Sequence, residues 1–134
     1  MKLLSAAAVR RCFIADPGYS IFSCDFDQIE LRVIAALARE PSMIEAAKAG
    51  VSLHLNAANK LFGKDHTPDQ YKLSKNINFT WAFGGGAGKM VSMYGISWEQ
   101  ARELIANYER SFPALVQFKR NEQNKILRTA LNPA

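Results

Sequence analysis

The segment from residue 67 to residue 86 constrains the fold more than any other part of the chain. Thr67 can cap a helix, Pro68 suits the first helical position, and Gln70 completes a capping box with Thr67. Consecutive glycines at positions 84–86 then end the helical pattern. These signals predict a helix over about residues 68–83.

One face of this predicted helix mixes a cation with aromatic rings. Tyr71, Lys75, Phe79 and Phe83 recur every four residues, so they form one ridge. Such a face would suit a bound nucleotide, because the cation can bind its phosphates and the aromatic rings can stack on its base. An amphipathic helix whose Lys75 stem lies beside core aromatics would show the same spacing. The spacing alone leaves both interpretations open.

The rest of the chain indicates short strands followed by helices. Residues 12–25 predict two short strands around a turn at Asp16-Pro17-Gly18. Apolar periodicity, capping residues and glycines then predict a series of helices. These helices cover about residues 28–39, 43–48, 53–62, 68–83, 89–94, 98–110 and 114–127. The predicted fold class is therefore α+β, with short antiparallel strands at the N-terminus and a mainly helical remainder.

The composition favours a soluble domain with a polyanionic partner. The 134 residues suffice for one domain with a hydrophobic core. No apolar run approaches the roughly 20 residues that a membrane-spanning helix needs. Lys and Arg total 17 against 12 Asp and Glu, and the net charge of +5 favours nucleic acid or nucleotide phosphates.

Acidic residues gather where the predicted strands give way to the helices. Asp25, Asp27 and Glu30 lie within six residues. A carboxylate at the end of a strand is a natural Mg²⁺ ligand, because this ion takes carboxylate oxygens together with substrate phosphates. Asp27 can instead cap the helix that begins at Gln28, and we favour this cap for Asp27.

Two of these segments resemble motifs of the family A, DNA polymerase I-type, DNA polymerases. Residues 25–32, DFDQIELR, are similar to the family's motif A, usually written DYSQIELR. The identical positions are Asp25, Gln28, Ile29, Glu30, Leu31 and Arg32. The family's motif B is a helix with four positions at four-residue steps, which hold Arg, then Lys, then either Phe or Tyr, and finally Tyr followed by Gly. In this chain the last three positions hold Lys75, Phe79 and the pair Phe83-Gly84.

The resemblance implies a metal site and a sugar contact in motif A. Asp25 would bind the two catalytic Mg²⁺ ions, and Phe26 would contribute its backbone carbonyl. Glu30 would be the steric gate that excludes a 2′-hydroxyl, and Gln28 would lie near the triphosphate. Asp27 departs from the family, which usually has Ser there.

The resemblance also implies a binding site for the incoming nucleotide, here called the nucleotide grip, which is formed by the helix of residues 68–83 and by His54. Lys75 would hold the triphosphate and stabilise charge on the transferring phosphoryl group. Phe79 would pack beside the sugar, Phe83 would stack near the templating position, and His54 would touch the triphosphate. Tyr71 stands where the family has a phosphate-binding Arg. Phe83 replaces the usual Tyr, so a hydroxyl bond from it to Glu30 cannot form.

The resemblance further predicts how the chain is organised and used. Residues 1–40 would begin the palm, residues 41–127 would form the fingers, and residues 128–134 would start a return toward the palm. The partners would be primer–template DNA, dNTPs and a further polymerase segment with the second palm carboxylate, which stands in a His-Asp-Glu motif. The chain would be a phage-like fragment or half of a split enzyme, inactive alone, in the cytoplasm of a bacterium or an infected host. The alternatives are a non-catalytic nucleotide- or DNA-binding module and a helical interaction protein.

Overall fold

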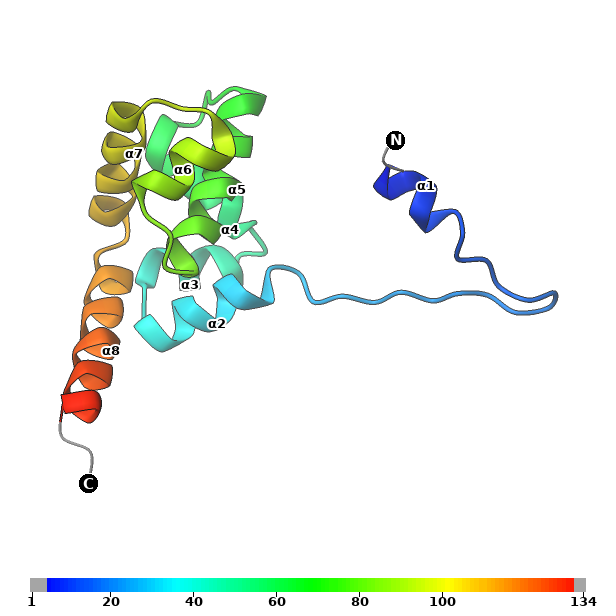
Figure 1. Cartoon of the computed structure of the whole chain (residues 1–134), viewed down its shortest axis with the longest axis horizontal. Coiled ribbons are helices and arrows are strands. Elements are labelled where there is room, and N and C mark those ends of the chain that lie inside the picture. Colours follow the sequence, from blue (N-terminus) through cyan, green and yellow to red (C-terminus); the bar gives the residue numbers. More distant parts are fainter. Residues whose placement is uncertain (1–4, 132–134) are drawn as a thin grey trace.

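The computed structural model describes residues 5–131, and every regular element in that range is a helix. Figure 1 shows a body of packed helices from which an extended segment leads away, reverses direction and ends in the first helix. The helices are α1 (Ala6–Arg10), α2 (Ile29–Ala38), α3 (Pro41–Lys48), α4 (Leu53–Phe62), α5 (Pro68–Ala82), α6 (Ala87–Tyr94), α7 (Trp98–Ser111) and α8 (Pro113–Leu131).

The predicted antiparallel strands are wrong, since residues 5–131 contain no strand. The turn between them is present, because the Tyr19 N–H donates to the Asp16 carbonyl over 2.9 Å and Gly18 has a φ of +87°. The segments on either side of it do not pair. Two isolated strands form a marginal hairpin at best, and they need a third strand or a covering apolar face. We call residues 12–27, which run from α1 to the helical body, the arm.

The helices follow the local signals of the sequence closely. Thr67 and Gln70 form the predicted capping box of α5, and Ser97 and Gln100 form another at the start of α7. Ser52 caps α4, with its hydroxyl accepting from the Leu55 N–H. The predicted return toward the palm over residues 128–134 lies partly outside the described residues, and its described part, 128–131, completes α8.

The glycines after α5 form a complete helix stop. Gly84 adopts the left-handed conformation, with a φ of +77°, and its N–H donates to the Trp81 carbonyl. The Gly85 N–H donates to the Thr80 carbonyl over 2.7 Å. These two bonds are the pair that defines a Schellman motif. The glycine run therefore ends a helix and turns the chain into α6.

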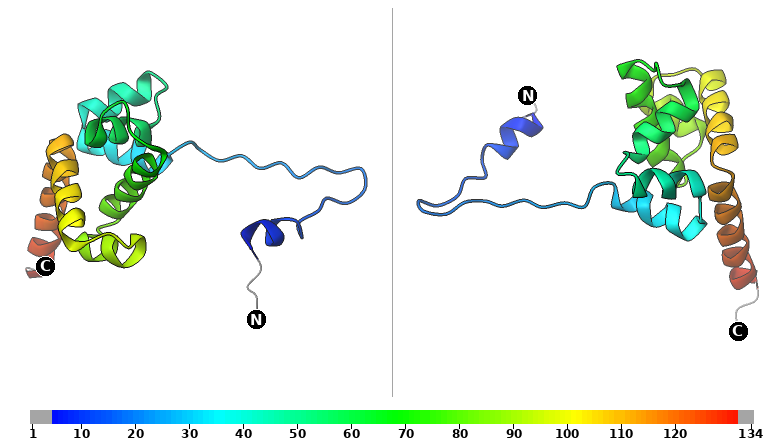
Figure 2. Two further views of the ribbon diagram at one scale, coloured as in Figure 1. Left: turned by 90° about the horizontal axis from the view of Figure 1, so that it is seen from above. Right: turned by 180° about the vertical axis from the view of Figure 1, so that it is seen from behind.

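The core lies where α4, α5 and α7 pack against one another. Ile77 and Trp81 of α5 are buried with Tyr108 of α7, and the Tyr108 ring lies 5.6 Å from Trp81 and 4.8 Å from Phe112. Helix α8 packs against α2 and α7. Figures 1 and 2 show α7 and α8 following one another down one side of the body. Across residues 5–131, no helix has both the length and the apolar character needed to cross a membrane.

Candidate functional site

The ridge predicted on α5 is an exposed surface. Lys75 is exposed, and Phe79 and Phe83 expose 37% and 65% of their surfaces. The rings of Phe79 and Phe83 are nearly parallel, with their centroids 6.3 Å apart. The Lys75 Nζ lies 6.0 Å from the centroid of the Tyr71 ring. These exposures disfavour an ordinary core stripe with a snorkelling lysine.

The Tyr71 end of the ridge has a neighbour that the sequence did not single out. His66 stacks on Tyr71 with 5.9 Å between the ring centroids and 21° between the ring planes. Both side chains are half-buried. The periodicity of the helix could not reveal this contact, because His66 lies before the helix begins.

His54 lies behind the ridge, at the start of α4, with only 5% of its surface exposed. Its ring centroid is 5.3 Å from that of Phe79, and its Nδ1 lies 3.0 Å from Nδ2 of Asn78. Burial lowers the pKa of His54, and the positive charge of Lys75 lowers it further, while Asp27 opposes both. His54 is therefore held in its neutral form beside an exposed cation.

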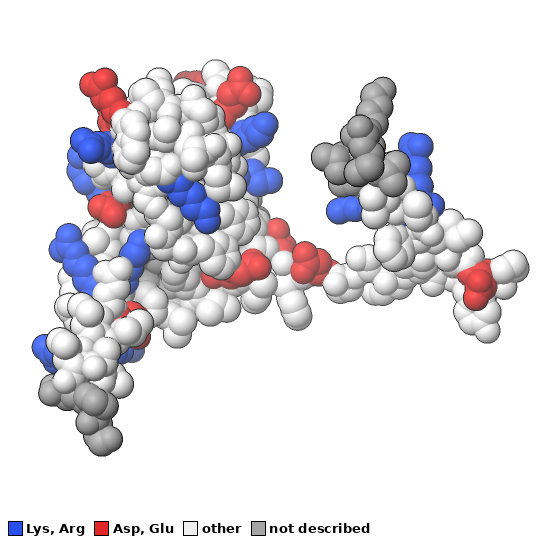
Figure 3. Space-filling model, viewed as in Figure 1, with Lys and Arg blue, Asp and Glu red and all other residues white. Residues whose placement is uncertain are grey.

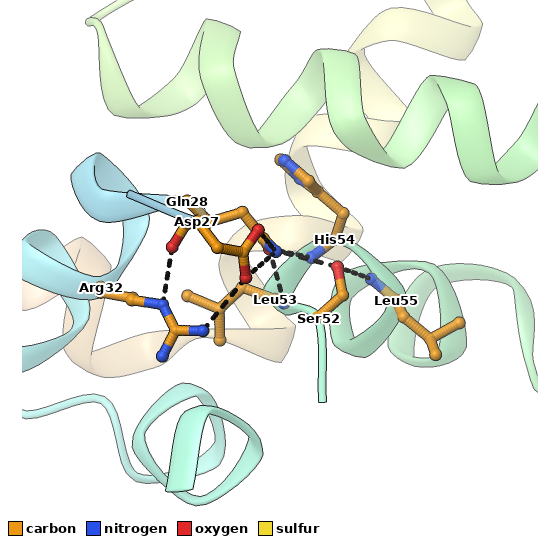
Figure 4. Close-up of polar contacts among 7 residues, drawn as sticks. All are labelled: Asp27, Gln28, Arg32, Ser52, Leu53, His54 and Leu55. Atoms are coloured by element: carbon orange, nitrogen blue, oxygen red, sulfur yellow. Dashed lines mark hydrogen bonds and ion pairs between the residues drawn. The ribbon is translucent and has the colours of Figure 1, made fainter. Parts of the chain in front are cut away.

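Gln28 joins motif A to the helix that carries His54 (Figure 4). Its Oε1 accepts from the Leu53 N–H at 2.8 Å, from the His54 N–H at 3.3 Å and from the Ser52 hydroxyl at 3.2 Å. The first turn of a helix has N–H groups without partners, so this amide oxygen satisfies donors of α4. Gln28 was predicted to lie near a triphosphate, and the structure shows that its oxygen is occupied by α4.

The predicted cap by Asp27 is wrong. The residue at the cap position of α2 is Gln28, which has a φ of +53° and makes no side-chain bond to the helix. The Asp27 carboxylate instead accepts from Gln28 Nε2 at 2.8 and 3.0 Å and from Arg32 Nη2 at 3.2 Å. The hydrogen bond from Gln28, followed by that from Arg32, lowers the pKa of Asp27.

The remaining predicted residues of motif A lie at the junction of arm and body. Asp25, Phe26 and Glu30 are all exposed, with Glu30 in the first turn of α2. Figure 3 shows acidic side chains where the arm meets the body and basic ones spread over the helices.

Comparison with known proteins decides the family. The family model described as DNA polymerase family A matches residues 2–131. The chain belongs to DNA polymerase family A. A DNA polymerase of Mycobacterium phage D29 is 39% identical over 129 residues, which cover 93% of this chain and 21% of the phage protein. DNA polymerase I of Helicobacter pylori strain J99 is 30% identical over 123 residues, covering 91% of this chain and 14% of that protein.

One solved structure has a similar fold. It is described as the POL domain of Pol1 from M. smegmatis in complex with DNA primer–template and dNTP. The match has a TM-score of 0.70 and 27% identity, and it covers 78% of this chain and 19% of that one. This chain thus spans about a fifth, or less, of the polymerases that it resembles.

Family A polymerases generally use divalent metal ions, and the donors near Asp25 match part of such a site. Mg²⁺ is usually held by one or two carboxylates together with substrate phosphates and waters. Asp25 offers an exposed carboxylate and Phe26 a backbone carbonyl, whereas the carboxylate of Asp27 is engaged by Gln28 and Arg32. Among residues 5–131 there is no group of three or more His, Cys, Asp or Glu side chains placed to hold an ion. The described residues therefore fit one metal carboxylate and not a complete cage.

Proposed function

We propose that this chain forms the nucleotide grip, and supplies one metal carboxylate, of an enzyme that carries out template-directed DNA synthesis. The reaction is the transfer of a dNTP to a primer 3′ end by a two-Mg²⁺ mechanism. The observation that carries the proposal is the convergence of Lys75, Phe79 and His54 between α4 and α5, in a chain of family A.

The charges and rings of this group suit a nucleotide. Lys75 is an exposed cation whose field reaches His54, so an incoming triphosphate would meet a positive charge and a neutral imidazole together. The rings of Phe79 and Phe83 would lie beside the sugar and near the templating base, respectively. Tyr71 lies beside Lys75 and would border the phosphates without the charge of an arginine.

The junction of arm and body would face the metal and the sugar. Asp25 and the Phe26 carbonyl would hold Mg²⁺, which supplies neutralisation of phosphate charge when it is bound. Glu30 would act as the steric gate, and Gln28 would position the start of α4 near the triphosphate. Within this scheme, residues 1–40 begin the palm and residues 41–127 form the fingers.

The partners that we propose follow from the relatives. The related Pol1 domain is described in complex with primer–template DNA and a dNTP, and we propose the same ligands for this chain. A further polymerase segment would bring the second palm carboxylate. We place this activity in the cytoplasm of a bacterium or of its phage-infected host.

A titration of dNTP with Mg²⁺ against the full chain tests the nucleotide grip. Lys75→Ala is expected to weaken binding by roughly 10- to 100-fold, because it removes a charge-assisted contact to phosphate. Lys72→Ala is the matched control, since Lys72 is also exposed on α5 but lies beside the ridge, about 100° from Tyr71 and about 60° from Lys75 around a 3.6-residue helix. Equal losses in the two variants would mean that only general charge attracts the nucleotide, and the grip would be refuted.

A further inference from the structure

A buried chain of hydrogen bonds connects His54 of α4 to Tyr108 of α7 through Asn78 of α5. The Tyr108 hydroxyl donates to Oδ1 of Asn78 over 2.8 Å, and Nδ2 of Asn78 lies 3.0 Å from Nδ1 of His54. Asn78 is fully buried and Tyr108 is 1% exposed. The chain thus crosses three helices, α4, α5 and α7, with little access for water.

The direction of these bonds follows from the hydroxyl of Tyr108. Among the described residues, Asn78 is its one hydrogen-bond partner. If the Asn78 amide were reversed, the hydroxyl would accept from Nδ2, and its own buried proton would have no partner. An unpaired buried donor is costly, so the hydroxyl donates to Oδ1 and the amide nitrogen faces His54. Burial raises the pKa of Tyr108 well above its usual value, with Glu40 adding to the rise, so this donor keeps its proton at neutral pH.

This direction sets the tautomer of His54. Because Nδ2 of Asn78 can only donate, Nδ1 of His54 must accept, and the proton of the neutral imidazole then lies on Nε2. The imidazole is also fixed in its tilt by the Phe79 ring at 5.3 Å. Two successive residues of α5, Asn78 and Phe79, therefore orient this imidazole from two sides.

We propose that Asn78 and Tyr108 are positioning residues that hold His54 as an Nε2–H donor for the phosphates of the incoming nucleotide. The inference rests on the proposed nucleotide grip and extends it to a residue on α7 that lies outside the ridge. Neither residue touches the nucleotide in this scheme. Each acts through the imidazole.

Tyr108→Phe tests the proposal with the smallest change. It removes one hydroxyl and leaves the ring that packs against Trp81 and Phe112. Tyr94→Phe is the matched control, because the Tyr94 hydroxyl also reaches α5, at Thr80 Oγ1 over 3.4 Å, but has no contact with His54. Both variants are compared with the unmodified full chain by ¹⁵N NMR of the imidazoles and by titration with dNTP and with the matching deoxynucleoside.

The NMR measurement is independent of any ligand. We expect the His54 imidazole to be the Nε2–H tautomer in the unmodified chain and in Tyr94→Phe, and a mixture of tautomers in Tyr108→Phe. A His54 proton on Nδ1 in the unmodified chain, or an unchanged tautomer in Tyr108→Phe, would overturn the proposal whatever the chain binds.

The titrations test the consequence for the nucleotide. Tyr108→Phe is expected to weaken dNTP binding by roughly three- to tenfold, with no change for the deoxynucleoside, since one oriented hydrogen bond to phosphate is impaired. In a His54→Ala background, the same substitution should cause no further loss. Undiminished dNTP affinity in Tyr108→Phe, while Lys75→Ala still weakens it, would overturn this inference and leave the nucleotide grip standing. Failure of the unmodified chain to bind dNTP would overturn both.

Discussion

Glu40 is a buried carboxylate that joins two helix starts at the corner between α2 and α3. It is 2% exposed, and its Oε2 accepts from the Ala114 N–H at 3.0 Å, in the first turn of α8. Its Oε1 accepts from the Ser42 hydroxyl at 3.2 Å, in the first turn of α3. A negative charge near a helix N-terminus interacts favourably with the helix dipole. Glu40 therefore links the start of α3 to the start of α8 without an ion pair among the described residues.

Removing this carboxylate should destabilise the whole body. Glu40→Ala is expected to lower the free energy of unfolding by about 1–3 kcal/mol, because it leaves a part-buried backbone N–H of α8 without its partner. Urea denaturation followed by circular dichroism measures the change. Glu45→Ala is the matched control, since Glu45 is exposed on α3, and the two variants should differ by most of that amount. Equal stabilities would contradict the structural role of Glu40.

His54 should make stability depend on pH. Its pKa in the folded chain is lower than the ordinary value of 6.5, so the unfolded chain binds its proton first as the pH falls. The free energy of unfolding therefore decreases as the pH falls below about 6.5. The decrease due to His54 is at most about 1.4 kcal/mol per pH unit. We expect His54→Gln to reduce the loss of stability between about pH 7.5 and pH 5.5, a range above the ordinary pKa of carboxylates. A loss of the same size in the variant, measured by urea denaturation, would show that other groups cause it.

At the scale of elements, the stop after α5 depends on close backbone contacts. A Cβ at Gly85 would lie 2.6 Å from Cγ2 and 2.8 Å from the carbonyl oxygen of Thr80. A Cβ at Gly86 would meet nothing within 4 Å. The two neighbouring glycines therefore differ in what they tolerate, although the sequence presents them as equivalent.

Alanine substitutions should separate these glycines. Gly85→Ala is expected to lower the free energy of unfolding by about 2 kcal/mol or more, because the backbone at Thr80 must move. Gly86→Ala should cost less than about 1 kcal/mol, as expected at a helix cap with open space. Thermal and urea denaturation of the two variants provides the comparison. Similar losses would argue that Gly85 has room that the structure does not show.

Local signals explain which elements could be predicted from the sequence. The starts of α4, α5 and α7 depend on caps at Ser52, Thr67 and Ser97, whose partners lie three residues away, and a helix was predicted to begin beside each of them. The predicted strands failed because a strand needs a partner that local propensity cannot supply. The cap by Asp27 failed because Gln28 takes a left-handed conformation at that position.

The candidate site shows the same division between local and distant contacts. The ridge on α5 follows from four-residue spacing, and the predicted residues Lys75, Phe79 and Phe83 do share a face. Asn78 and Tyr108 were not predicted as site residues, because their contact joins residues 30 positions apart. A buried asparagine between Ile77 and Trp81 was the available sign, since a polar side chain in an apolar stripe needs a partner.

At the scale of the whole molecule, the arm and the body differ in how far they expose their large apolar side chains. The arm exposes large apolar side chains along its whole length, whereas the body exposes some, such as Phe83 and Trp98, and buries others between α4, α5 and α7. Backbone groups without partners and side chains without neighbours have little resistance to local opening. The arm should therefore be the part of the chain that a protease reaches first.

Limited digestion with chymotrypsin checks this difference. Phe13, Tyr19 and Phe22 of the arm are exposed by 73%, 78% and 89%. We expect cleavage there first, leaving a helical body that starts near Phe26, as identified by mass spectrometry. Phe79 is also accessible, but it lies within α5, where the helix resists the extended geometry that a protease needs. Early cleavage at Phe79 together with an intact arm would contradict the described arrangement.

The nitrogen and the oxygen of the Gln28 amide contact different segments, and this couples the substitutions that the two segments can accept during evolution. One end holds the Asp27 carboxylate and the other holds the start of α4, so one planar group serves both neighbours. Replacing Asp27 with the serine usual in the family would remove the carboxylate to which Gln28 Nε2 donates. The amide would then be held less firmly in the orientation in which its Oε1 accepts from the start of α4. The effects of substitutions at position 27 and at positions 52–54 should therefore not add, and the effect of introducing a family residue at one of these positions would depend on which residues stand at the others.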